Sequence, residues 1–89
     1  MYTAEWADDN PLCLDLSEFQ ARFAVRVRRM REVRGLRQED LEEYGLAWRT
    51  IQKLEYGHTD VKISTLLKLC QAFNVTLLEL LSMDEAGAA

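Results

Sequence analysis

The sequence predicts an all-α fold, a compact bundle of five helices in a single domain. Apolar residues make up 48% of the chain, with one proline and four glycines, which is the composition of a helical globule rather than of a disordered chain. Apolar positions also recur at helical spacing in five separate segments. A chain of 89 residues buries only about 60–70% of its unfolded surface, so it does not divide into two cores. We therefore expect one domain, at residues 17–83, that folds without a cofactor.

The first helix is expected at about residues 17–34. Ahead of it, residues 1–16 show no sustained period and contain the turn-prone run DDNP, so we interpret them as an irregular acidic arm. Ser17 and Gln20 have the spacing of a capping box. Apolar residues then follow at helical intervals: Phe19, Phe23, Val27 and Met30. Three arginines line one flank of this apolar stripe and are expected to form mostly a solvated face: Arg22, Arg26 and Arg29.

Glycines delimit the second helix. Gly35 is expected to end the first helix in the manner of a helix-terminal glycine, and Leu36 then returns the chain to the core. A short second helix covers about residues 38–44 and ends at Gly45. A tight turn at this glycine therefore joins the second helix to the third.

The third helix, expected at about residues 47–56, has two unlike faces. Its core face carries three apolar residues: Ala47, Ile51 and Leu54. Arg49 and Lys53 point almost directly away from that face at the roughly 100° that each helical residue turns. Two helices joined by a tight glycine turn, with a basic outer face on the second, form the unit that places a recognition helix in the major groove of DNA.

Two further helices complete the predicted bundle. After Gly57 and a polar loop, apolar residues mark a fourth helix that Asn74 ends: Ile63, Leu66, Leu67, Cys70 and Phe73. Thr76 and Glu79 have capping-box spacing and open a fifth helix. It contains three leucines: Leu77, Leu80 and Leu81. These exceed what so small a core needs, so we expect part of this helix to pack across a two-fold axis, with the N-terminal arm as a second candidate surface. Residues 84–89 are expected to form a flexible tail.

The net charge of -4 is divided unevenly along the chain. Residues 1–18 contain five acidic and no basic side chains, which gives -5, and residues 63–89 contain one lysine and three acids, which gives -2. Residues 19–62 contain ten basic and seven acidic side chains, which gives +3. The middle of the chain is therefore the part suited to a polyanion, whereas the acidic ends oppose non-specific binding to DNA.

Several other classes of protein are disfavoured. No apolar run approaches the roughly 18–20 residues of a membrane span, and the first residues do not look like a secretory signal, so we expect a cytoplasmic location. Cys13 and Cys70 form no CxxC pair and lie far from His58 in the sequence, which argues against a zinc site. We interpret Cys70 as a core residue, with a Cys13–Cys70 bridge or a redox switch as the alternative. No nucleophile–base pair, metal-ligand spacing or phosphate-binding loop suggests an enzyme.

Several short segments at matched spacing resemble the Xre family, the helix-turn-helix regulators related to lambdoid phage repressors and Cro. The segments are Arg31, residues 35–41 (GLRQEDL), Gly45-Leu46, residues 50–57 (TIQKLEYG) and residues 65–69 (TLLKL). The resemblance covers about residues 20–81. It implies a phage-repressor-like five-helix domain that regulates transcription, usually as a homodimer on a palindromic DNA operator, and that needs no cofactor.

The resemblance also implies roles for residues of the third helix and its surroundings. Arg49 and Lys53 match positions that reach base edges, where cationic side chains suit the O6 and N7 acceptors of guanine. Trp48 matches another base-contacting position but lies nearer the core edge, so it either touches a thymine methyl group or packs on the second helix. Contacts to the sugar–phosphate backbone are expected from five residues: Gln38, Thr50, His58, Thr59 and Lys62.

Two features of the family pattern concern how the third helix is held. Arg31 and Glu55 match positions that form an ion pair between the first and third helices. The stretch from Leu41 to Gly45 is one residue shorter than usual, so the second helix must end early and the third helix could tilt. Ala47 replaces the usual hydroxyl-bearing N-cap, a change that typically costs about 1 kcal/mol.

The main alternative function is an interaction protein of the same fold, such as the antitoxin of a toxin pair or an anti-repressor, which would explain the acidic ends. The retention of Arg49 and Lys53 on an exposed face argues against a purely protein-binding role. A controller of a restriction–modification system is a subtype of the main hypothesis. Glu39 and Glu43 on the second helix could contact RNA polymerase, because activators of this family use acidic residues there.

Overall fold

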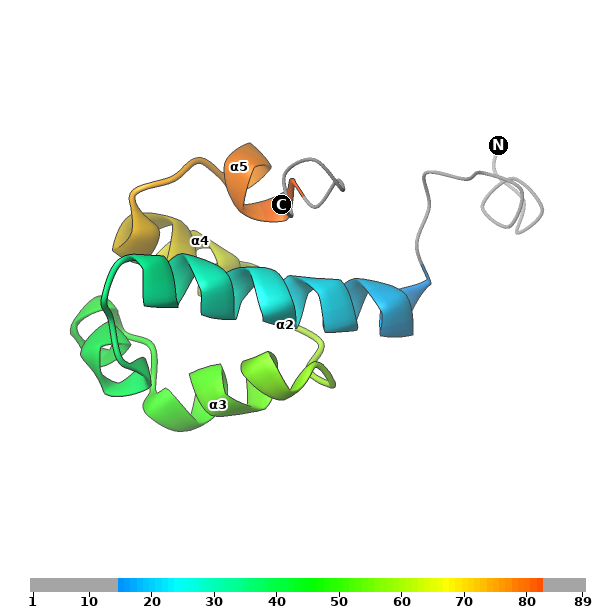
Figure 1. Cartoon of the computed structure of the whole chain (residues 1–89), viewed down its shortest axis with the longest axis horizontal. Coiled ribbons are helices and arrows are strands. Elements are labelled where there is room, and N and C mark those ends of the chain that lie inside the picture. Colours follow the sequence, from blue (N-terminus) through cyan, green and yellow to red (C-terminus); the bar gives the residue numbers. More distant parts are fainter. Residues whose placement is uncertain (1–14, 83–89) are drawn as a thin grey trace.

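The computed structural model describes residues 15–82, in which there are five helical segments and no strand. In chain order they are α2 (Leu16–Val33), the 3-10 helix η1 (Gln38–Tyr44), α3 (Trp48–Tyr56), α4 (Ile63–Phe73) and α5 (Leu77–Leu81). Figure 1 shows α2 spanning the molecule, with α3 along one flank and α4 and α5 on the other. The predicted all-α fold with five helices is confirmed.

The start of α2 differs from the expectation. The helix begins at Leu16, and its N-cap is Asp15, whose carboxylate accepts a hydrogen bond from the backbone N–H of Glu18 at 2.7 Å. The predicted capping box at Ser17 and Gln20 is therefore wrong, because the cap lies two residues upstream and Ser17 sits inside the first turn. Residues 1–14 of the predicted arm, and the predicted tail at 84–89, lie outside the described residues.

Residues in the left-handed conformation end the helices where the sequence predicts. Gly45 has a φ of 82° after η1, and Asn74 has a φ of 57° after α4. A glycine adopts this conformation without steric cost, and asparagine tolerates it better than most residues. At the fifth helix, Thr76 and Glu79 form the predicted capping box, in which each side chain bonds the other residue's backbone N–H at 3.1 and 2.8 Å.

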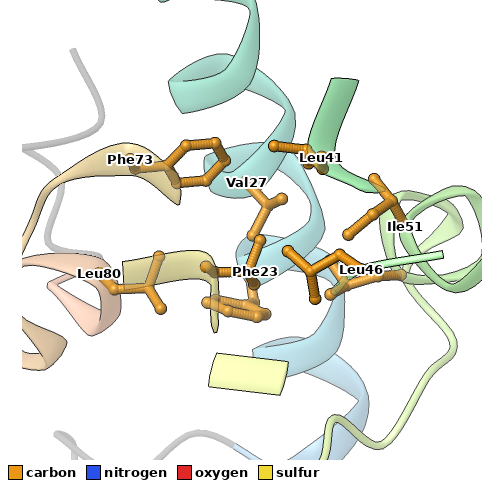
Figure 2. Close-up of a cluster of buried hydrophobic side chains, with 9 residues drawn as sticks. Phe23, Val27, Leu41, Leu46, Ile51, Phe73 and Leu80 are labelled. Carbon is orange, nitrogen blue, oxygen red and sulfur yellow. The ribbon is translucent and has the colours of Figure 1, made fainter. Parts of the chain in front are cut away.

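The core lies where all five helical segments meet. Figure 2 shows side chains from each of them pointing toward one another: Phe23 and Val27 of α2, Leu41 of η1, Ile51 of α3, Phe73 of α4 and Leu80 of α5, with Leu46 from the turn. Each of these side chains is at most 2% exposed. Since every element contributes at least one fully buried side chain to a small core, the position of each helix depends on all the others.

The buried face of α4 and the role of α5 differ in part from the prediction. In α4, Leu69 is fully buried, whereas Ile63 and Leu67 are 72% and 50% exposed. Leu69 and Phe73, one turn apart, face the core and turn Ile63 and Leu67 away from it. In α5, Leu80 belongs to the core, whereas Leu78 and Leu77 are 81% and 39% exposed. The three leucines that were expected together to exceed the needs of the core therefore differ: Leu80 fills the core, Leu81 packs against it, and Leu77 is exposed.

Two arginines of the α2 region bind backbone carbonyl groups. Arg26 donates to the carbonyl oxygens of Glu79 and Leu80, the latter at 3.0 Å, so it stabilises the C-terminal end of α5 and is not simply solvated. Arg34 donates to the carbonyl oxygen of Phe73 at 3.0 Å and lies 5.3 Å from the centre of its ring. These contacts hold α4 and α5 against α2 and leave α3 on the opposite flank.

Candidate nucleic-acid interface

η1 and α3 form two helices joined by a tight turn at Gly45. Leu46, the next residue, is 2% exposed and anchors the turn in the core. Lys68 of α4 donates to the carbonyl oxygen of Gly45 at 3.3 Å, so the turn is also held from a third helix. The orientation of α3 relative to η1 is therefore supported by apolar and polar contacts.

η1 occupies the predicted residues, but it winds as a 3-10 helix. Such a helix rises about 2.0 Å per residue, compared with about 1.5 Å in an α-helix, so a stretch that is one residue short can still span the distance from α2 to α3. At its start, the Asp40 carboxylate accepts hydrogen bonds from the guanidinium of Arg37 at 3.0 Å and from its backbone N–H at 2.7 Å. The Arg37 side chain, followed by this backbone bond, lowers the pKa of Asp40.

The inner face of α3 carries Ile51 and Leu54, which are 0% and 2% exposed. Ala47 was expected on the same face, but this prediction is wrong: Ala47 is exposed and serves as the N-cap, with extended backbone dihedrals. Its side chain makes no cap hydrogen bond, as expected for alanine. The carboxylate of Glu42 instead accepts a bond from the backbone N–H of Trp48, at 3.4 Å.

Arg31 and Glu55, which were expected to pair, form a two-pronged ion pair between α2 and α3. The two bonds are 2.8 and 3.0 Å long, and the side chains are only 11% and 5% exposed. Arg31 also donates to the carbonyl oxygen of Leu36 at 2.8 Å, and the side-chain amide of Gln38 donates to Glu55 at 3.1 Å. The hydrogen bonds that Arg31 donates to Glu55 raise the pKa of Arg31 against the opposing effect of burial, so the arginine stays charged. This network ties α3 to both α2 and η1.

The outer face of α3 consists of five exposed residues: Trp48, Arg49, Gln52, Lys53 and Tyr56. Trp48, Gln52 and Tyr56 follow one another at four-residue intervals, and Arg49 and Lys53 form the adjacent stripe. The guanidinium of Arg49 lies 5.8 Å from the centre of the Trp48 ring. This face carries two positive charges, and none of its five residues is acidic.

The remaining predicted contact residues lie around this face to different degrees. Thr50 is exposed on α3, and His58 and Lys62 are exposed in the loop that follows it, with Thr59 half-buried between them. Lys62 is also the N-cap of α4, but its side chain makes no cap hydrogen bond. Gln38 is half-buried, and one of its side-chain amide N–H groups donates to Glu55. Its second amide N–H and its backbone N–H are therefore the donors that remain for a phosphate.

Gln52 and Tyr56 are the two outer-face residues that the sequence analysis did not single out. Tyr56 is 72% exposed at the end of α3. A glutamine can read adenine through its N6 and N7 atoms, so Gln52 offers a type of base contact that the two cations do not. Their four-residue spacing from Trp48 was the signal that could have identified both residues.

The described part of the chain contains neither a cluster of metal-ligating side chains nor a helix that could span a membrane. Within residues 15–82, no three His, Cys, Asp or Glu side chains gather as a metal ion would require. None of the helices in that range has both the length and the apolar character to cross a membrane. Cys70 is half-buried and packs against the core, as expected.

Comparison with known proteins addresses the same region. A helix-turn-helix family model matches residues 27–80, which is more than half of the 89 residues. The match runs from the middle of α2 to Leu80 of α5 and contains η1, the turn at Gly45 and α3. No curated protein and no solved structure matches the chain.

Proposed function

Because this chain belongs to the Xre-like helix-turn-helix family of DNA-binding regulators, we propose that it recognises a specific double-stranded DNA sequence by placing α3 in the major groove. The observation that carries the proposal is the division of α3 into two faces. The inner face is held by the core and by Glu55, and the outer face exposes Arg49 and Lys53 with no acidic neighbour on that face. A helix held in this way presents its outer side chains at a defined angle, which reading base edges requires.

The outer-face residues would read bases, and the residues around them would contact phosphates. Arg49 and Lys53 suit guanine, Gln52 suits adenine, and Trp48 offers an apolar edge to a thymine methyl group. Thr50, Lys62 and the loop residues His58 and Thr59 would bind the sugar–phosphate backbone, as would Gln38 at the start of η1. Phosphate contacts fix the position of the protein on the duplex, and base contacts decide which duplex it prefers.

The proposed function includes a homodimer on a palindromic operator. α3 is about 14 Å long, so one copy contacts only a few base pairs, and useful specificity requires two half-sites about one helical turn apart. Leu78 and Leu77 of α5, which are 81% and 39% exposed, are the apolar residues that we expect at the two-fold axis. Sedimentation as a monomer at tens of micromolar on its operator would rule this arrangement out.

Selection of bound duplexes from a random library tests the proposed function directly. The affinities of the wild type, Arg49→Ala and Lys62→Ala are then measured on the selected duplex and on a scrambled one. Arg49→Ala should lose about 1–3 kcal/mol on the selected duplex and little on the scrambled one, because it removes a base contact. Lys62→Ala is the matched control on the same side of the domain. It should weaken both duplexes and lower the salt-dependence slope by about one unit, because one fewer counterion is released.

The opposite result would favour the alternative function. If the wild type prefers no duplex sequence, or if Arg49→Ala weakens both duplexes equally, α3 does not read DNA. An antitoxin or another protein-interaction subunit of the same fold would then be the better interpretation. Glu39 and Glu43, both exposed on η1, would be available to a partner protein or to RNA polymerase in either case.

A further inference from the structure

The outer face of α3 is not covered by any other helix of the described chain, and the segment ahead of α2 has the charge and the reach to cover it. We propose that residues 1–14 dock on the outer face of α3 when DNA is absent and compete with DNA for that face. This inference rests on the proposed function, because it concerns the regulation of the same DNA-reading surface.

Charge complementarity is the first argument. Residues 1–14 contain Glu5, Asp8 and Asp9 and no basic residue, which gives a charge of -3. The outer face of α3 offers Arg49 and Lys53, and none of its residues is acidic. Carboxylate oxygens accept the same charge-assisted hydrogen bonds from arginine and lysine as phosphate oxygens do. The acidic segment can therefore occupy the cations that would otherwise meet the DNA.

The point where the segment joins the domain is the second argument. Gly57, directly after α3, lies so close to α2 that a Cβ atom built on it would be 3.5 Å from the Cα of Ala21. Asp15 is six residues before Ala21, or about 9 Å along the helix axis. The segment therefore leaves the domain near the C-terminal end of α3. Fourteen residues span up to roughly 46–50 Å when extended, which exceeds the length of α3, at about 14 Å, several times.

The acidic residues at the other end of the chain are less well placed. Residues 83–89 follow α5, which Arg26 holds against α2. Figure 1 shows α5 and α3 on opposite flanks of α2. Asp84 and Glu85 carry two negative charges and follow α5 in the sequence, so they provide a matched control for the same change of net charge.

The expected effect follows from tethering. A segment tethered by a short stretch of chain is present at its own domain at an effective concentration of the order of millimolar, so even a weak contact is substantially populated. DNA must displace the segment, so the apparent affinity for DNA equals the intrinsic affinity multiplied by the fraction of molecules in which the face is free. Removing two of the three acidic charges should therefore tighten DNA binding by about threefold.

The experiment compares the wild type, the double variant Asp8→Asn/Asp9→Asn and the control Asp84→Asn/Glu85→Gln. Affinity is measured on the selected duplex and on a scrambled duplex at one ionic strength. The first double variant should bind both duplexes about threefold more tightly than the control, because the segment blocks the face for any DNA. Without DNA, amide chemical shifts from Arg49 to Tyr56 should change in the first variant and stay as in the wild type in the control.

The two readouts separate the failure of this inference from the failure of the proposed function. Equal gains in affinity for the two double variants would show a general effect of net charge and overturn the docking. Unchanged α3 amide shifts in the Asp8→Asn/Asp9→Asn variant would overturn it as well, whatever the DNA result. If no duplex sequence is preferred but the α3 shifts still move, the proposed sequence-specific reading fails and the docking on α3 stands.

Discussion

The inner and outer faces of α3 differ in how closely neighbouring residues hold them. Ile51 and Leu54 are at most 2% exposed, and Glu55 is bonded to both Arg31 and Gln38. On the opposite face of the same helix, Tyr56 is 72% exposed, and Gln52 and Lys53 are exposed as well. A nine-residue helix thus carries its contribution to stability on one side and its proposed contribution to recognition on the other. Substitutions on the inner face should therefore change the free energy of unfolding, and substitutions on the outer face should change the affinity for DNA.

The largest expected effect is on the inner face. Glu55→Ala leaves the guanidinium of Arg31 buried without its carboxylate and removes the acceptor of Gln38. The free energy of unfolding in urea should fall by about 3 kcal/mol or more, which is the range for breaking a buried pair. Glu32→Ala is the matched control, because it breaks the exposed pair with Arg28, in which the side chains are 55% and 64% exposed. The control should cost less than about 1 kcal/mol, and equal losses for the two variants would show that Glu55 does not anchor α3.

The next effect is on the outer face and should leave stability unchanged. Gln52→Ala shortens an exposed side chain, so the urea midpoint should stay within experimental error of the wild type. Affinity for the selected duplex should fall by about 1–3 kcal/mol if Gln52 reads an adenine. Gln71→Ala, at an exposed position of α4, is the control for losing a surface glutamine. Equal affinities for the two variants would remove Gln52 from the reading face.

A smaller effect should come from Ala47, the N-cap of α3, which belongs to neither face. Ala47 is an N-cap with suitable backbone dihedrals but no side-chain acceptor, and Glu42 reaches Trp48 only at 3.4 Å. Ala47→Ser supplies a hydroxyl oxygen for a free backbone N–H of the first turn and should raise the free energy of unfolding by about 0.5–1 kcal/mol. Thermal unfolding at neutral pH measures the gain. An unchanged or lower melting temperature would show that the Glu42 contact already fulfils the capping role.

The smallest expected effect is the pH dependence of stability that comes from Glu79 in α5, which lies on the opposite flank of α2 from α3 (Figure 1). The backbone N–H of Thr76 lowers the pKa of Glu79 below its ordinary value of 4.5. A carboxyl group whose pKa is lower in the folded state stabilises the fold above that ordinary value, and this stability is lost as the pH falls through the folded-state pKa. The melting temperature of the wild type should therefore exceed that of Glu79→Gln at pH 6 by more than at pH 3. A difference that does not change with pH would exclude this contribution.

Much of the candidate site could be predicted from the sequence, because it depends on spacing along one helix. Arg49 and Lys53 lie opposite Ile51 and Leu54 in any α-helix that covers these residues, and the structure exposes the first pair and buries the second. Gln52 and Tyr56 could have been predicted from the same helical spacing, since they follow Trp48 at four-residue intervals. The hydrogen bond from Gln38 to Glu55 could not be predicted from local spacing, because it joins residues that are 17 apart in the chain.

The start and the end of each helix follow from the sequence to within about one residue, because caps and left-handed residues act through local backbone geometry: Gly45, Gly57, Asn74 and the box of Thr76 and Glu79. Which apolar residues fill the core depends instead on how the helices pack. Leu67, Leu69, Leu78 and Leu80 have the same chemistry, and two of them are buried only because of where α4 and α5 meet α2. The same holds for Arg26, whose partners are backbone carbonyl groups 53 and 54 residues away. No local pattern marks such contacts, because a carbonyl group looks the same at every position until the fold brings it near a donor.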